Sequence, residues 1–373
     1  MALGRLEVDQ GLRAEALLLV TGADDHLALE YRHQRVLVDL MLGETLARGK
    51  SEEDDAGGLV VGVKDARRVR LNRLCVQAPE VHAGIIGAMC KAMRMDVGRF
   101  GVWTTYHAIG EENAGEAAAL AEELGFGTFW LGGSPRLPAT RPLLEAADAI
   151  AVGTGIVNVW AYDPAQLARE YAELSPEFAD RLLVGIGIGH PEATSDYTRP
   201  LKSMRAFLDG LDAAPEPIPP ERRCLAALGP KMLDLCRERS RGTLTYFVPA
   251  EHTRAARARL GADALVATEL ACVLDTEVES ARTTARRYAE MYLGLRNYTG
   301  NLLRYGFTEE DVAGGGSDRL IDAIVPHGTA DDIAVAARQH LDAGADHVCL
   351  QPVGTRGVPR AEWSALASAL GLG

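Results

Sequence analysis

From residue 96 onward, short apolar segments alternate with longer amphipathic ones, and this alternation limits the possible folds more than any other feature. The apolar segments are continuous runs, as expected for parallel strands that are covered on both faces. Eight strands are expected, at Phe100–Trp103, Thr128–Leu131, Ala151–Val159, Leu182–Ile188, Arg223–Leu228, Thr243–Val248, Leu265–Leu274 and His347–Val353. The pattern predicts an α/β fold.

Helices are expected between these strands. They span Glu112–Leu124, Pro142–Ile150, Pro164–Leu174, Leu201–Leu211, Lys231–Arg239, Thr253–Leu260, Glu277–Leu295, Ala330–Ala343 and Arg360–Leu370. Eight strand–helix units in residues 96–373 match the size of a (β/α)₈ TIM-like barrel. An open, doubly wound sheet is the competing architecture. The Gly-rich stretch Tyr292–Ser317 resembles an insertion near the end of the barrel that would carry the active site.

Residues 1–95 do not follow this alternation and are expected to form an N-terminal extension that is mainly helical or poorly ordered. Two helices are expected at residues 11–21 and 26–48, before a polar break at Lys50–Gly58. The extension could be a small helical interaction domain of its own. Alternatively, natural translation could begin at Met93 or Met95, which is the slightly favoured interpretation because residues 96–373 contain a whole barrel without it.

Composition excludes several classes of protein. The formal net charge of −13 disfavours nucleic acid or an anionic membrane as the main partner. The six cysteines are scattered without a CxxC pair, so reduced, mostly buried thiols are expected, and the absence of HxH and HExxH groups argues against a metal site. Without an apolar run of membrane-spanning length or a secretory signal, a cytoplasmic location is expected.

The barrel interpretation directs attention to the residues that follow each strand, because active sites of such barrels lie at the carboxyl ends of the strands. Alternate glycines at Gly185, Gly187 and Gly189 leave bare backbone at one strand end, which favours a ligand over tight packing. For the glycines of Gly153–Gly155, a ligand and plain packing are equally compatible with the sequence. The turn Leu228–Pro230 would present free N–H groups to a phosphate, although by itself it looks like an ordinary turn.

Polar side chains that could move a proton also lie near strand ends. They are Thr104, Tyr106, His107, His190, Tyr246 and Glu269. The histidines His252, His327, His340 and His347 lie in or beside helices or at a strand start, so they are interpreted as structural.

Several segments together resemble the luciferase-like monooxygenase superfamily, and within it the actinobacterial branch of oxidoreductases that use the deazaflavin coenzyme F420. They are Gly98–Thr104, Phe129–Pro135, Ala151–Trp160, Gly185–Glu192, Ala226–Leu233, Glu251–Thr253, Asn297-Tyr298, Gly315–Leu320 and Gly344–Gln351. They occur in order through the whole barrel region, and residues 1–95 are not covered.

The resemblance implies a cofactor that lies across the carboxyl end of the barrel. A non-prolyl cis peptide at Gly155–Ile156 would lie under the deazaflavin ring, and Gly132 and Gly133 would line the edge of the ring. The strand end Gly187–His190 and the turn Leu228–Pro230 would hold the tail and phosphate. The full set of expected cofactor-binding residues is Gly132, Gly133, Gly155, Ile156, Asn158, Gly187, Gly189, His190, Leu228, Gly229 and Pro230.

The sequence also departs from better-understood relatives that act on a sugar phosphate. Those relatives carry an acid–histidine pair after the second strand and a glutamate after the fourth. This chain has Gly132-Gly133-Ser134 and His190 at those places, so neither the proton donor nor the substrate carries over.

The expected function is hydride transfer between F420 and an unidentified small organic substrate, with His107, Tyr246 and His190 as the candidates for the proton. An FMN-dependent luciferase-like monooxygenase on the same scaffold is the nearest alternative. A non-catalytic barrel that binds a flavin or deazaflavin is the alternative from another class. Relatives suggest a homodimer.

Overall fold

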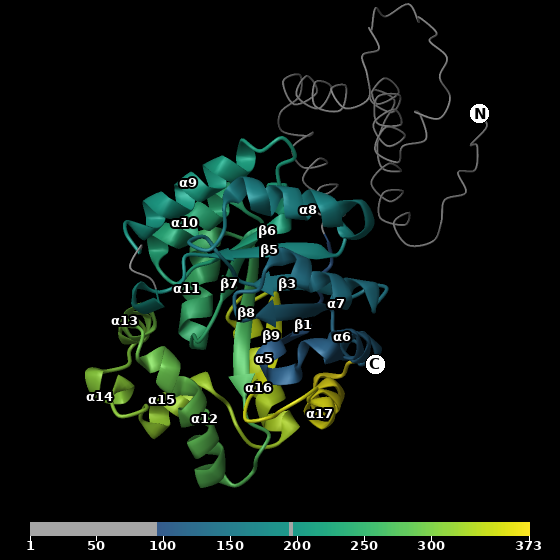
Figure 1. Ribbon diagram of the computed structural model, residues 1–373. Helices are drawn as coiled ribbons and strands as arrows, with labels where there is room; N and C mark the ends of the chain where they lie inside the picture. The colour runs from purple at the N-terminus through teal and green to yellow at the C-terminus, as the bar shows by residue number, and fades with distance from the viewer. Residues whose placement is uncertain (1–94, 194–196) are drawn as a thin grey trace, which may run out of the picture. The chain divides into compact units, whose positions relative to one another are not determined.

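The computed structural model describes residues 95–193 and 197–373 (Figure 1). Met95–Gly373 form one compact unit. The helices expected at residues 11–21 and 26–48, with Cys75 and Cys90, lie outside the described residues.

Within the described residues, nine parallel strand segments form one sheet that closes on itself. They are β1 (Phe100–Thr104), β2 (Thr128–Gly132), β3 (Ala151–Gly155), β4 (Val157–Asn158), β5 (Leu182–Gly187), β6 (Arg223–Ala226), β7 (Gly242–Thr245), β8 (Leu265–Cys272) and β9 (His347–Pro352). The ring closes because β3 pairs with both β2 and β5, while β1 pairs with β2 and β9. The predicted barrel is confirmed, and the open sheet is excluded because no edge strand remains.

The third predicted strand is interrupted, so β3 and β4 together count as one of the eight strands of the barrel. The interruption falls at Ile156, between Gly155 and Val157, where the sequence indicated a bulge. The other strands lie within four residues of their predicted ends, and most differences are at the carboxyl end, where the backbone leaves the sheet.

Helices follow the strands around the outside of the barrel. The longer ones are α6 (Ala114–Glu123), α8 (Pro164–Phe178), α9 (Pro200–Asp212), α10 (Pro230–Arg239), α11 (Ala250–Leu260), α12 (Val278–Leu293), α13 (Arg296–Arg304), α16 (Ala330–Asp342) and α17 (Arg360–Leu370). The short ones are α5 (Tyr106–Ile109), α7 (Arg141–Glu145), α14 (Glu309–Val312) and α15 (Asp318–Ile324). The helix predicted at Pro142–Ile150 ends five residues early, because Ala149 and Ile150 turn back to donate their N–H groups to Glu122.

The predicted insertion near the active-site end forms helices. Tyr292–Ser317 contains α13 and α14, and Figure 1 shows α12 to α15 grouped at the end toward which the β8 arrow points. Arg282 of α12 bridges to Asp318 at 2.9 Å and Asp322 at 2.7 Å in α15, which ties these helices to one another.

The interior of the barrel contains two stacked tryptophans, Trp103 and Trp130, and a neutral histidine, His347. Trp130 donates its Nε1–H to Nε2 of His347 at 3.0 Å, and Nδ1 of His347 lies 2.8 Å from the carbonyl oxygen of Gly98. Burial lowers the pKa of His347 to about 4. Burial likewise lowers the pKa of His252 in α11 and of His340 in α16 to about 4. These positions agree with the structural interpretation of the three histidines.

Four of the predicted thiols are within the described residues. Cys224, Cys236, Cys272 and Cys349 are buried and unpaired, as expected. Burial raises the pKa of Cys224 to about 12, so this thiol stays protonated and unreactive.

Candidate active site

The three glycine-bearing segments meet at one edge of the barrel. Asn158 of β4 pairs with Gly187 of β5, and Ile186 of β5 pairs with Leu225 of β6. Because all strands are parallel, their carboxyl ends face the same way. The residues at this edge are partly exposed, and they include Gly155, Ile156, Asn158, Ile188, Gly189, His190, Leu228 and Gly229. The segments therefore form one continuous surface that a ligand could approach.

The peptide bond Gly155–Ile156 is cis, at the position that the family resemblance implies. The space beside Gly155 is already filled from within the barrel. A Cβ atom on Gly155 would lie 2.1 Å from the Trp103 ring, and one on Gly132 would lie 2.6 Å from Nε1 of the same ring. Close packing of Trp103 thus explains why neither position has a side chain. Their contact with a cofactor ring stays a prediction.

The alternate glycines of β5 also pack against their own chain. A Cβ on Gly185 would lie 1.9 Å from the carbonyl oxygen of Thr154, and one on Gly187 would lie 2.5 Å from the Ile156 side chain. Gly189 differs, because its φ of +64° is a conformation that other residues rarely adopt. Packing therefore accounts for Gly185 and Gly187, although the sequence favoured a ligand there.

We expect Gly155→Ala to destabilise the protein by about 1–3 kcal/mol, the usual cost of overpacking a filled core. Trp103 cannot easily give way, since its ring packs against both Trp130 and Tyr246. Urea denaturation without cofactor measures the effect. Gly300→Ala in α13 is the control, because a Cβ there meets nothing within 4 Å. Equal stability of the two variants would show that Trp103 does not require a glycine at position 155.

An aromatic cluster borders this edge from the side of β7 and the insertion. It consists of Tyr246 and Phe247 after β7, Tyr288 and Tyr292 of α12, and Tyr298 of α13. The ring centroids of Tyr246 and Tyr292 are 5.2 Å apart, and those of Phe247 and Tyr298 are 5.7 Å apart. Tyr246 also lies 5.1 Å from Trp103, which connects the cluster to the barrel interior next to Gly155.

The tyrosine hydroxyl groups of this cluster converge on Tyr246. The Tyr288 hydroxyl donates to that of Tyr246 at 2.8 Å, and the Tyr246 hydroxyl donates to Oε1 of Gln351 at 2.9 Å. The Tyr292 hydroxyl is 2.9 Å from the hydroxyl oxygen of Tyr246. Behind them lies Glu269 of β8, with Oε1 3.4 Å from the Tyr288 hydroxyl. The backbone N–H of Phe247 donates to Oε2 of Glu269 at 3.3 Å.

Burial controls the protonation of this network. It raises the pKa of Glu269 to about 8, and only weak hydrogen bonds from Phe247 and Tyr288 oppose the shift. The pKa of Tyr246 is raised well above 10, first by burial and then by the nearby Glu269 carboxyl. At neutral pH, Glu269 is therefore mostly a neutral acid and Tyr246 a neutral phenol, so the network can pass a proton between hydroxyl groups.

The structure brings two of the three predicted catalytic residues to the same cluster. Tyr246 and His190 both contact Tyr298, with ring centroids 6.3 Å and 5.1 Å away. His190 Nδ1 also lies within 3.0 Å of the side-chain amide of Asn297, which joins the end of β5 to α13. His107 is exposed on α5 and makes no such contact with the cluster.

Several residues of the network were not singled out from the sequence. Tyr288, Tyr292, Trp103 and Gln351 come from three separate parts of the chain. One signal was available, because Tyr288 and Tyr292 are four residues apart within the predicted helix Glu277–Leu295 and so share a face. Their meeting with Tyr246 depends on how the insertion folds back over the barrel, which no local pattern contains.

Comparison with known proteins agrees with this fold. Residues 95–209 match the family model described as luciferase-like monooxygenase. Over these residues the match agrees with the predicted resemblance to luciferase-like monooxygenases. Members of this family are oxidoreductases and monooxygenases, which agrees with an enzymatic role. The comparison with curated proteins found no match to this chain.

Solved structures share the barrel fold at low sequence identity. An F420-dependent secondary alcohol dehydrogenase in complex with an F420–acetone adduct is 14% identical, with a TM-score of 0.55, covering 74% of this chain and 99% of that one. The F420-dependent tetrahydromethanopterin reductase from Methanopyrus kandleri is 15% identical, with a TM-score of 0.57 and the same coverage. The FMN-bound oxygenating constituent of 3,6-diketocamphane monooxygenase from Pseudomonas putida is 12% identical, with a TM-score of 0.54, covering 73% and 96%. At these identities the likeness concerns the fold.

Two further absences concern only the part of the chain that the structure describes. No helix there is long and apolar enough to cross a membrane. No group of three or more histidine, cysteine or acidic side chains there could hold a metal ion.

Proposed function

We propose that the chain is an oxidoreductase that transfers a hydride between the deazaflavin F420 and a small organic substrate. The observation that carries this proposal is the adjacency of the ends of β3, β5 and β6, next to the hydroxyl network of Tyr246. A flat redox ring needs such an open edge on one side and a proton-handling group within reach of its substrate. The family match and the F420-dependent neighbours support the choice of chemistry.

The residues present fit a cofactor with an anionic chain. Gly229 is the N-cap of α10, and no side chain caps this helix end. Pro230 has no N–H and the N–H of Met232 donates to the Gly229 carbonyl oxygen at 3.1 Å, so the backbone N–H of Lys231 is the donor of the first turn that is left to a phosphate. A Cβ on Gly229 would meet nothing within 4 Å, so there is open space in front of this helix end. We assign the phosphate to the turn Leu228–Pro230 and the ring to the edge formed by Ile156 and Asn158.

When bound, the deazaflavin would supply or accept the hydride. The proton that accompanies it would pass through the hydroxyl group of Tyr246, which Gln351 and Tyr288 hold in a fixed orientation. Reduction of a ketone consumes one hydride and one proton, and oxidation of an alcohol releases both. Tyr246 is preferred to His190 and His107 because it lies beside Trp103 and the barrel interior, whereas His107 is exposed on α5.

Titration of the purified protein with F420 and with FMN, followed by fluorescence, tests the proposal. We expect saturable binding of F420 and much weaker binding of FMN. Preferential binding of FMN would instead indicate the flavin-dependent monooxygenase. Binding of neither would reject the proposal, and tight F420 binding without turnover on a panel of alcohols and enones would favour a carrier.

We expect Gly229→Asp to weaken F420 binding by at least about tenfold without loss of stability. Aspartate is a preferred N-cap residue, so the helix should be stabilised, yet its carboxylate would repel the cofactor phosphate. The φ of −90° at Gly229 suits any residue. Fluorescence titration and thermal denaturation measure the two effects, with Gly300→Asp as the control. Unchanged affinity would show that the phosphate binds elsewhere.

A further inference from the structure

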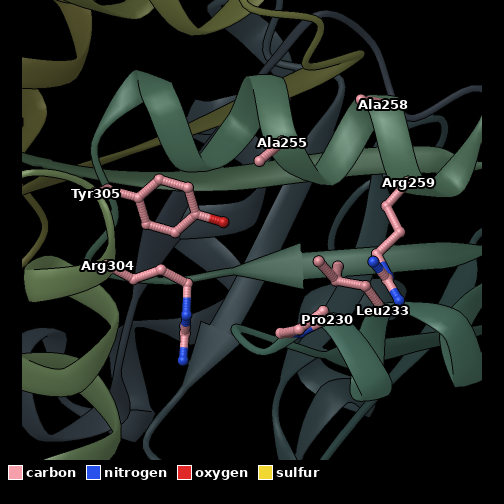
Figure 2. Close-up of a pocket in the computed structure, with 7 residues that line it drawn as sticks. All are labelled: Pro230, Leu233, Ala255, Ala258, Arg259, Arg304 and Tyr305. Atoms are coloured by element: carbon pink, nitrogen blue, oxygen red, sulfur yellow. The ribbon is translucent and has the colours of Figure 1, made fainter.

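A surface cavity of about 390 Å³ lies next to the proposed phosphate site but outside the mouth of the barrel. Its walls come from three helices: Pro230 and Leu233 of α10, Ala255 and Arg259 of α11, and Arg304 and Tyr305 at the end of α13. Figure 2 shows Arg304 and Tyr305 on one side of the space, with the α10 and α11 residues facing them. The insertion therefore completes a cavity that the barrel helices begin.

The charge of this cavity is opposite to that of the whole protein. Although the chain has a net charge of −13, no acidic residue is among those that line the cavity, and two of them are arginines. Asp234 holds Arg259 with two hydrogen bonds of 2.7 and 2.6 Å. Arg304 is exposed, and its Nη1 donates to Oδ1 of Asn301 at 3.2 Å; among the described residues no acidic side chain forms an ion pair with it. The Arg304 guanidinium is thus the charge available to an anion.

Two buried polar side chains behind the Arg304–Tyr305 wall have an atom without a hydrogen-bond partner in the described part of the chain. They are His252, at Nδ1, and Asn301, at Nδ2. His252 is fully buried, its ring lies edge-on to Tyr305 with centroids 5.2 Å apart, and its Nε2 is 3.1 Å from the carbonyl oxygen of Leu228. Unsatisfied polar atoms are uncommon in folded proteins and often accompany a bound ligand or water.

The path from the barrel mouth to the cavity is short. Strand β6 ends at Ala226, the turn Leu228–Pro230 follows, and Pro230 itself lines the cavity. A chain that leaves a phosphate on this turn would enter the space between α10, α11 and α13. Its apolar floor of Leu233 and Ala255 suits the methylene groups of such a chain, and Arg304 suits its carboxylates.

We propose that this cavity binds the carboxylate-bearing tail of the deazaflavin, with Arg304 as the residue that recognises it. The inference rests on the proposed function and deepens it. F420 carries a chain of carboxylates beyond its phosphate, whereas FMN ends at the phosphate. The cavity would therefore select the deazaflavin over FMN at a site remote from the ring.

Fluorescence titration of the full chain with two deazaflavins tests this inference. One is F420, and the other is the deazaflavin core without phosphate and tail. We expect Arg304→Gln to weaken F420 binding about tenfold and to leave binding of the core unchanged. Arg304→Glu should weaken F420 binding further. Arg296→Gln is the matched control, because Arg296 lies on the same helix with a fully solvated side chain and should leave both affinities unchanged.

The possible outcomes distinguish a failure of the tail assignment from a failure of the proposed function. If Arg304→Gln leaves F420 affinity unchanged, or weakens both ligands equally, the tail assignment is wrong while the proposed function stands. If neither deazaflavin binds the wild type, the proposed function fails and the inference with it. Inorganic phosphate and free glutamate are titrated alone by calorimetry. The inference would be overturned if phosphate or glutamate bound in a way that depends on Arg304 while F420 bound independently of Arg304. The cavity would then be assigned to a free anion.

Discussion

Glu269→Gln is expected to abolish most of the loss of folding stability that the wild-type protein shows as the pH rises from 6.5 to 8. Burial raises the pKa of Glu269 to about 8, above the ordinary value of 4.5 that applies in the unfolded chain. Between these values the folded state keeps a proton that the unfolded state releases. The free energy of unfolding therefore falls by about 1.4 kcal/mol per pH unit, and by up to about 5 kcal/mol in all.

Glutamine resembles the protonated carboxyl in shape and can keep the contacts to Phe247 and Tyr288, but it cannot ionise. Urea denaturation of the two proteins at several pH values between 6.5 and 9 measures the difference. Glu290→Gln, at an exposed position of α12, the helix that contains Tyr288, is the control and should retain the wild-type slope. If Glu269→Gln also retains that slope, Glu269 is already ionised in the native protein and cannot be a proton reservoir for Tyr246.

The positions of the strands and helices could be predicted because they depend on local patterns. Continuous apolar runs located all eight strands of the barrel, and the glycine–proline pair at Gly229-Pro230 marked the start of α10. Closure of the sheet is a different matter. It depends on pairing of Val152 with Leu182 and of Phe100 with Val348, and the latter two residues are almost the whole barrel apart in sequence. Only the count of strand–helix units favoured the barrel.

The site was less predictable, because several of its features arise from side chains distant in sequence. Trp103 removes the free space beside Gly132 and Gly155, so glycine alone did not distinguish a ligand from a packed ring. Glu269 was recognisable as a polar residue near a strand end, yet its neighbour Tyr288 comes from α12 and its neighbour Tyr246 directly follows β7. The positive φ of Gly189 also means that any substitution there strains the backbone, so Gly229 is the better probe of the cofactor.

Burial keeps one titratable side chain neutral at each end of the barrel interior, with different consequences. At the carboxyl end, Glu269 is held in a neutral form that can release a proton within the range of neutral pH. At the amino end, burial lowers the pKa of His347 to about 4 and keeps its ring neutral, although the hydrogen bond to Gly98 opposes this shift. The first arrangement suits proton transfer, and the second fixes the floor on which Trp103 and Trp130 stack. The same physical effect thus separates a chemical residue from a structural one.

The protein is expected to lose stability as the pH falls from 6.5 to 4, because three buried histidines outweigh the opposite effect of Glu269, and His347→Gln should remove one of the three histidine contributions. The pKa of His347 is lowered from 6.5 to about 4, so the unfolded state binds a proton in this range that the folded state refuses. Each such histidine removes up to about 3 kcal/mol, and His252 and His340 behave alike. A protonated His347 would turn a second N–H toward the Trp130 donor.

Urea denaturation between pH 4.5 and 7 measures the slope, with the exposed His107→Gln as control. Because glutamine loses the contacts of the ring, His347→Gln should also be less stable at pH 7. An unchanged slope would mean that His347 is protonated in the native barrel, in conflict with its hydrogen bond from Trp130.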